Sequence, residues 1–277
     1  MFSKNVLLFS VLFASVLAIS ASAQMRPSMS GNASSGNKAD MKKLNTDSVK
    51  EGSAWTLTFP LGDHVESTID TLTYNYQRTS IPAMVSDAYA STGNLGAEGI
   101  NMIYFQRPER QPFFFQDALD AWLPSFRKQK FYNVYVPTTI LSYGFAGNKQ
   151  THQDRLSATF AGNVNRRIGI GAMVDYIHSK GAYEAQAVKD FVWGFTGYYT
   201  GDRYEMQAFY QNYSLINKEN GGITDDLYIT DPAELQGGVD KIETKSIPTR
   251  LTAAHNRITG DELFMTHAYK IGFWKTQ

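Results

Sequence analysis

The residues of this chain that could do chemistry are few and scattered. Its five histidines lie at positions 64, 152, 178, 255 and 267, and their spacings match no metal-binding motif. The sequence contains no Gly-x-Ser-x-Gly, His-Glu-x-x-His, phosphate-loop or dinucleotide-binding motif, and it has no cysteine. It therefore predicts no catalytic residue, no metal site and no cofactor, and we expect a protein that is not an enzyme.

Two histidines have neighbours that could take part in a site. His152 and Asp154 could supply two metal ligands, but they fall in a predicted loop, where a solvated pair is the simpler interpretation. His255 and Asn256 are adjacent, so in a strand their side chains would point to opposite faces, which argues against a shared catalytic site. The more informative feature of this sequence is its overall pattern.

The strongest pattern is an alternation of apolar with polar or small residues at a period of two, which is typical of β-strands. It is clearest where two alternating segments flank the turn Asn165-Arg166-Arg167. One face of the first segment carries Leu156, Ala158, Phe160, Gly162 and Val164, and one face of the second carries Ile168, Ile170, Ala172, Val174 and Tyr176. Each segment is predicted to be a strand with one apolar face.

Seven segments of about ten residues are predicted to be strands, a length that crosses a bilayer at a tilt. One of them, residues 249–258, alternates poorly and is assigned from its neighbours. Short turns are predicted at residues 165–167, 200–203 and 259–262, and long connections at residues 147–154, 179–190 and 217–246. Short periplasmic turns that alternate with longer external loops are typical of outer-membrane barrels. This alternation of short and long connections therefore favours a barrel over a soluble β-sandwich.

The chain is predicted to have four parts. Residues 1–23 combine a basic start, a short apolar core and a small-x-small ending, which describes a cleaved signal peptide. Residues 24–52 are polar and predicted to be a flexible leader. Residues 53–136 are predicted to be a periplasmic or plug-like segment with short strands, and residues 137–277 to be transmembrane strands. The predicted fold class is all-β: an antiparallel up-and-down transmembrane β-barrel.

The polar strand faces supply the candidate site of such a barrel. The predicted pore-lining residues are Asn163, Asp175, Glu205, Gln207 and Gln211. In a water-filled lumen they would set pore size and ionic preference, with acidic groups favouring cations. The alternative is that they hydrogen-bond one another and conduct nothing.

A transmembrane barrel would also explain the aromatic residues at the strand ends. Tyr and Trp prefer membrane interfaces, where an apolar ring meets hydrated headgroups. The predicted interface aromatics are Tyr143, Tyr176, Trp193, Tyr199, Tyr204, Tyr210 and Tyr269. The alternative is that they pack a soluble sheet.

Several short motifs carry a family resemblance. The stretch KFYNVYVPTTILSYGFAG from Lys130 to Gly147, together with DTLTYNY, TGNLG, PFFFQDALDAWL and KENGGITDD, resembles the putative-porin family of outer-membrane β-barrel proteins in Bacteroidota. The resemblance runs from about Trp55 to the end and implies a barrel without a catalytic centre. Family members are longer, and seven strands would leave the C-terminus outside the cell with two unpaired edges. We therefore expect this chain to be an N-terminal portion of a longer barrel; the alternative is that further strands lie between residues 55 and 136.

These features predict an outer-membrane, porin-like barrel, surrounded by lipid, for passive diffusion of small hydrophilic solutes. The alternative is a non-conducting structural or adhesion barrel that binds an external partner through the long loop at residues 217–246. A secreted, soluble, carbohydrate-binding β-sandwich is a third hypothesis. With 26 basic and 26 acidic residues and no basic stripe, the chain is not expected to bind nucleic acid, and homo-oligomerisation stays open.

A charge on the apolar strand face is expected to be costly. If Ala172 or Phe195 lies near the bilayer midplane, replacing it by arginine should lower the free energy of unfolding by about 2 to 4 kcal/mol. Urea unfolding from lipid vesicles measures this change. A cost near zero would show that this face meets water rather than lipid.

Overall fold

The computed structural model of the chain describes residues 52–58, 61–69, 86, 88–107, 113–123, 129–235, 237–238 and 240–272. The predicted signal peptide, nearly all of the predicted leader, the segment DTLTYNYQ and the last five residues lie outside these ranges. None of the helices within these ranges is both long and apolar enough to cross a membrane.

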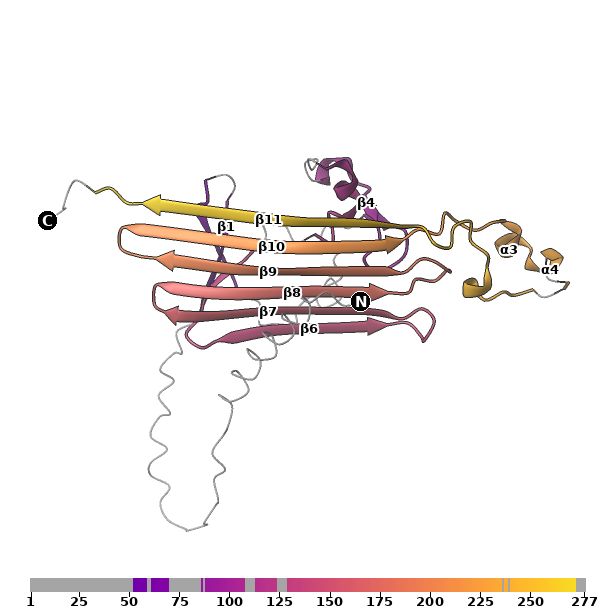
Figure 1. Cartoon of the computed structure of the whole chain (residues 1–277), viewed down its shortest axis with the longest axis horizontal. Coiled ribbons are helices and arrows are strands. Elements are labelled where there is room, and N and C mark those ends of the chain that lie inside the picture. Colours follow the sequence, from indigo (N-terminus) through magenta and orange to yellow (C-terminus); the bar gives the residue numbers. More distant parts are fainter. Residues whose placement is uncertain are drawn as a thin grey trace, which may run out of the picture. The chain divides into compact units, whose positions relative to one another are not determined.

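Six long antiparallel strands form the main sheet, in the order in which they follow one another along the chain. Figure 1 shows them side by side, with the tight turns at one end and the loop that carries short helices at the other. The strands are β6 (Thr138–Ala146), β7 (Gln153–Asn165), β8 (Ile168–Ser179), β9 (Val188–Thr200), β10 (Tyr204–Lys218) and β11 (His255–Tyr269). The all-β, antiparallel up-and-down fold is therefore confirmed.

The register divides the side chains of the sheet between two faces. Residues that pair across strands share a face, so Ala172 lies between Phe160 and Phe195 on what we call the outer face. Asp175 lies on the opposite, inner face. The outer face carries the apolar positions predicted from the alternation. The inner face carries most of the fully buried side chains of the sheet, because another part of the chain packs on it.

The prediction of two strands joined by a tight turn between residues 249 and 273 is wrong. β11 is one continuous strand, and Gly260 pairs with Tyr213 near its middle. Glycine is required there because a Cβ atom at position 260 would lie 2.3 Å from the Tyr213 hydroxyl oxygen. Asp261 accepts a hydrogen bond from the Tyr210 hydroxyl at 2.7 Å. The Gly-Asp pair thus serves cross-strand packing, and the sheet has six strands rather than seven.

Because the sheet has six strands rather than seven, β11 ends at the other end of the sheet from the one predicted. Tyr269 pairs with Tyr204 at the start of β10, so β11 ends beside the tight turns and not beside the long loops. The expectation that an odd strand number leaves this end outside the cell is therefore wrong.

The connections keep the predicted alternation of short and long. Tight turns at residues 166–167 and 201–203 alternate with connections at residues 147–152, 180–187 and 219–254. The longest one contains α3 (Leu227–Thr230), α4 (Pro232–Leu235) and the 3-10 helix η5 (Thr244–Ser246). Within it Ile223 and Thr249 form an isolated antiparallel bridge.

β6 and β11 are the two edges of the main sheet. Among the residues that the structure describes, each of them pairs on one side only, so the sheet is open and consistent with an incomplete barrel. A strand edge exposed to lipid leaves N–H and C=O groups unpaired, and each such group costs several kcal/mol. A closed barrel has to satisfy both edges.

Residues 52–134, which we call the inner segment, form small elements before the main sheet. β1 (Ser53–Leu57) lies between β2 (His64–Ser67) and β5 (Phe131–Asn133) in a three-stranded sheet. β3 (Tyr89–Ser91) and β4 (Gly99–Asn101) form a hairpin. Two short 3-10 helices follow the hairpin, η2 (Tyr104–Gln106) and η3 (Phe114–Leu119).

Two apolar clusters hold the inner segment on the inner face. The cluster nearer the long loops comprises Leu119, Ala121, Trp122, Ile177, Val192, Tyr213 and Leu215. The cluster nearer the tight turns comprises Leu57, Phe131, Tyr198 and Phe209. Burial of one large apolar side chain stabilises a protein by about 1.5–3 kcal/mol. Burial of the side chains in these two clusters therefore holds the inner segment against the sheet.

The register of β10 and β11 can be tested because the chain has no native cysteine. Ser214 pairs with Thr259, so Ser214→Cys with Thr259→Cys should form a disulfide, since paired Cα atoms lie within the distance that a disulfide spans. Ser214→Cys with Asp261→Cys is displaced by two residues and should stay reduced. Non-reducing gels and mass spectrometry report both. A cross-link in the displaced pair alone would contradict the register.

Candidate functional site: the inner face

The five residues predicted to line a pore all lie on the inner face. Asn163 is on β7, Asp175 is on β8, and Glu205, Gln207 and Gln211 are on β10. They are spread along the sheet and do not form one cluster. Gln207 and Gln211 are buried, and the other three are half-buried. A shared face is what pore-lining residues require, and their role in a pore stays a prediction.

Part of the charge on this face is paired within the sheet. The Arg155 guanidinium donates to both oxygens of Asp175, at 2.7 and 3.2 Å. Such a bidentate pair orients both side chains as well as neutralising their charge. Gln211 donates a hydrogen bond to Glu262 on the neighbouring strand. Because an amide is uncharged, this hydrogen bond does not neutralise the Glu262 carboxylate.

Two of the predicted residues bind the inner segment directly. Asn163 donates to the Asn133 side chain at 2.5 Å. The Gln207 amide nitrogen lies 2.6 Å from His64 Nε2, while its carbonyl oxygen accepts from the Thr266 hydroxyl at 2.9 Å. These partners could not be predicted from the sequence, because Asn133 and His64 lie outside the alternating segments and no spacing rule connects them to β7 or β10.

The β3–β4 hairpin docks on the inner face at the end where the long loops lie. Asn94 donates to the backbone carbonyl of Gln186 at 2.5 Å and accepts a hydrogen bond from the Ser179 hydroxyl. The indole N–H of Trp122 donates to the carbonyl of Ala97 at 2.7 Å. The hairpin loop is therefore tied both to the sheet and to the residues that follow η3.

Glu98 supplies the charge of the hairpin loop. Its carboxylate accepts hydrogen bonds from Asn217 at 2.5 Å and Asn256 at 3.1 Å. Burial alone would raise the pKa of Glu98, but these hydrogen bonds outweigh it and hold the pKa below its usual range. Asn256 also donates to Glu219 at 2.7 Å, and burial together with the charge of Glu98 raises the pKa of Glu219. Of the two carboxyls, Glu98 is the one that holds its charge.

Asp190 is a second acidic group under the hairpin loop. Its side chain is 2% exposed, and the backbone N–H of Ile216 faces it without making a well-formed hydrogen bond to either oxygen. Gly96 crosses directly over it with φ at +82°, and a Cβ atom there would lie 2.6 Å from Asp190 Oδ2. Only glycine therefore allows the loop to approach this closely.

The residues that the structure describes contain no group of three or more His, Asp or Glu placed to hold a metal ion. His152 and Asp154, the pair considered from the sequence, are in contact at 2.6 Å. They form a half-buried ion pair when the histidine is protonated.

All seven predicted interface aromatics lie on the outer face: Tyr143, Tyr176, Trp193, Tyr199, Tyr204, Tyr210 and Tyr269. Tyr143 donates its hydroxyl to Asp154 at 3.1 Å, and Tyr210 donates to Asp261 at 2.7 Å. At the tight-turn end, the ring centroids of Tyr199 and Tyr204 are 6.1 Å apart. Rings with one apolar and one polar end suit an interface, and the girdle itself stays a prediction.

Comparison with known families gives a match that covers most of the chain. A family model described as putative porin matches residues 53–277. The chain belongs to the putative porin family. No curated protein and no solved structure matches it. Membership of this family supports a porin-like role, implies an outer-membrane location and suggests a non-enzymatic protein. The match begins at the first residue of β1, so the inner segment is part of the family domain.

The charge of Glu98 should control how firmly the hairpin is docked. Because its pKa is lowered in the folded chain, its stabilising effect is present at neutral pH and is lost as the pH falls through that lowered pKa. Glu98→Gln imitates the protonated state. Since hydrogen bonds to a charged group contribute about 1.5–3 kcal/mol, amide exchange over residues 88–101 should accelerate about ten- to hundredfold at neutral pH.

Hydrogen exchange read by mass spectrometry tests this expectation in the full chain. Glu66→Gln is the matched control, because Glu66 is exposed on β2 and belongs to the same segment. Equal exchange in the two variants would show that Glu98 does not hold the hairpin.

Proposed function

We propose that the protein is an outer-membrane porin that allows passive diffusion of small hydrophilic solutes along its inner face. The observation that carries the proposal is the division of the sheet: most of the exposed aromatic and large apolar side chains of the strands lie on one face, and most of their amide side chains lie on the other. This division suits lipid outside and water inside, as in transmembrane barrels. The tight turns then lie in the periplasm and the long loop at residues 219–254 lies outside the cell.

The inner segment narrows the path in this proposal. It covers Gln207 and contacts Asn163, and its hairpin occupies the inner face at the external end. Solutes then pass between the inner segment and the remaining wall, which limits the path to small molecules. The support for this step is the match of the family domain to the inner segment and the strands together.

The charges of the inner face favour cations. The strands place Asp175, Asp190, Glu205 and Glu262 on this face, against Arg155. Arg155 neutralises Asp175, and Lys270 pairs with Glu205. Asp190 is 2% exposed beneath the hairpin loop, so Glu262 is the carboxylate of this set that gives the path negative charge. Rings or rows of carboxylates lower the energy of cations in a narrow aqueous path.

Electrical recording of the full-length protein in planar bilayers tests the proposal. Stepwise insertion of ohmic conductance is the expected result. A folded, membrane-inserted protein that carries no current would overturn the diffusion function and would leave the non-conducting barrel with a binding loop as the better explanation.

Ion selectivity gives a residue-level prediction. Glu262→Gln removes a carboxylate from the inner face, so the ratio of cation to anion permeability should fall, as measured by the reversal potential in a KCl gradient. Asp261→Asn is the matched control, because Asp261 is the next residue of β11 and lies on the outer face. If both variants changed the reversal potential equally, the inner face would not be the conducting one.

A further inference from the structure

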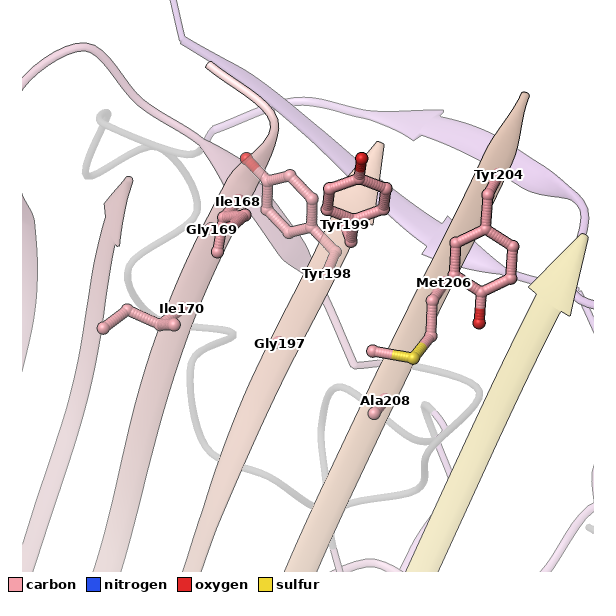
Figure 2. Close-up of a pocket in the computed structure, with 9 residues that line it drawn as sticks. All are labelled: Ile168, Gly169, Ile170, Gly197, Tyr198, Tyr199, Tyr204, Met206 and Ala208. Carbon is pink, nitrogen blue, oxygen red and sulfur yellow. The ribbon is translucent and has the colours of Figure 1, made fainter. Parts of the chain in front are cut away.

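A shallow apolar groove runs along the outer face beside the tight turns. Figure 2 shows the residues that line it, which come from β8, β9 and β10. Its volume is about 610 Å³. Seven of its nine lining residues belong to the outer face: Ile168, Ile170, Gly197, Tyr199, Tyr204, Met206 and Ala208.

Small residues in the middle strand and its neighbour create the groove. Ile170, Gly197 and Ala208 pair in one row across the three strands. Gly197 has open space where a side chain would stand, and Ala208 adds only a methyl group. The isoleucines of β8 and the rings of Tyr199 and Tyr204 rise around this low floor, as Figure 2 shows.

The groove is short enough to lie within one leaflet of a bilayer. It runs from Tyr204, at the first position of β10, to Ala208. Four residues of an extended strand span about 13 Å. One half of the hydrocarbon core of a bilayer is about 15 Å thick.

Basic residues stand at the open end of the groove. Arg166 and Arg203 belong to the two tight turns beside it, and neither takes part in an ion pair among the described residues. Arg167 is paired with Asp202, and Lys270 with Glu205. The loop at residues 219–254, at the other end of the sheet, has seven acidic and three basic residues. Positive charge that is not neutralised is therefore available on the turn side.

We propose that the groove binds one anionic phospholipid of the periplasmic leaflet. An acyl chain lies over Gly197 and Ala208, and the phosphate contacts Arg166 and Arg203. Arginine suits this role because its guanidinium binds phosphate oxygens bidentately. The inference rests on the proposed membrane placement, with the tight turns in the periplasm, and does not depend on conduction through the inner face.

The test measures lipid retention by the full-length protein. Delipidated protein in detergent is titrated with phosphatidylglycerol or with phosphatidylcholine of the same acyl chains, and native mass spectrometry counts the lipids retained. Retention of phosphatidylglycerol should exceed that of phosphatidylcholine, by about fivefold for each free arginine if each contributes about 1 kcal/mol.

Two pairs of variants locate the site. Ala208→Phe fills the groove and should abolish the tight phosphatidylglycerol complex, whereas Ser214→Phe, on the same face of β10 but outside the groove, should not. Arg166→Gln with Arg203→Gln should remove the preference for phosphatidylglycerol. Lys189→Gln with Lys218→Gln, at the opposite end of the outer face, should leave it unchanged.

The outcomes separate this inference from the proposed function. Equal retention of the two lipids by the native protein, or equal retention by Ala208→Phe and Ser214→Phe, overturns the lipid site. If Ala208→Phe does not fold, the arginine pair decides, because both arginines lie in exposed turns. Conductance of the same preparations reports on the pore alone, so a silent protein that still selects phosphatidylglycerol overturns the diffusion function and keeps the lipid site.

Discussion

The rest of this structure depends on the antiparallel register of six strands with a side-chain period of two. Because paired residues share a face, every strand has to place its apolar set on the same side as its neighbours. Ala172 illustrates the constraint, since it stands between Phe160 and Phe195 on the outer face. A slip of one residue between two strands would send Asp175 and its neighbours toward lipid, where charge is costly.

The inner face has a different task, which is to receive the inner segment. Apolar side chains such as Leu215 and Phe209 are buried against it, while Asn163 and Gln207 bind it through hydrogen bonds. A face that contacts protein in some places and water in others needs both apolar and hydrogen-bonding side chains. The hairpin loop adds a charged contact through Glu98, so one end of the inner face is tied by groups whose strength depends on protonation.

The outer face is also not uniform along the strands. Toward the long loops, the hydroxyl of Tyr143 reaches the carboxylate of Asp154, and near the middle of β10 the hydroxyl of Tyr210 reaches Asp261. Toward the tight turns, small residues leave the groove over Gly197, and the turns carry Arg166 and Arg203, which form no ion pair with the residues that the structure describes. Since the two leaflets of an outer membrane present different headgroups, the two ends of one face can be adapted to different lipids.

The sequence alone determined the fold class, the two faces and the order of short and long connections, because alternation and turn composition are local properties that tertiary contacts did not override here. It also assigned Gly260-Asp261 to a turn, and this was wrong: a glycine required for a tight turn and one required by a neighbouring ring look alike in a single sequence, and only the register with Tyr213 separates them. The tertiary structure likewise decided that the inner segment binds two of the predicted pore residues, Asn163 and Gln207. His64 and Gln207 are 143 positions apart, and a contact at that separation leaves no periodic trace in the chain.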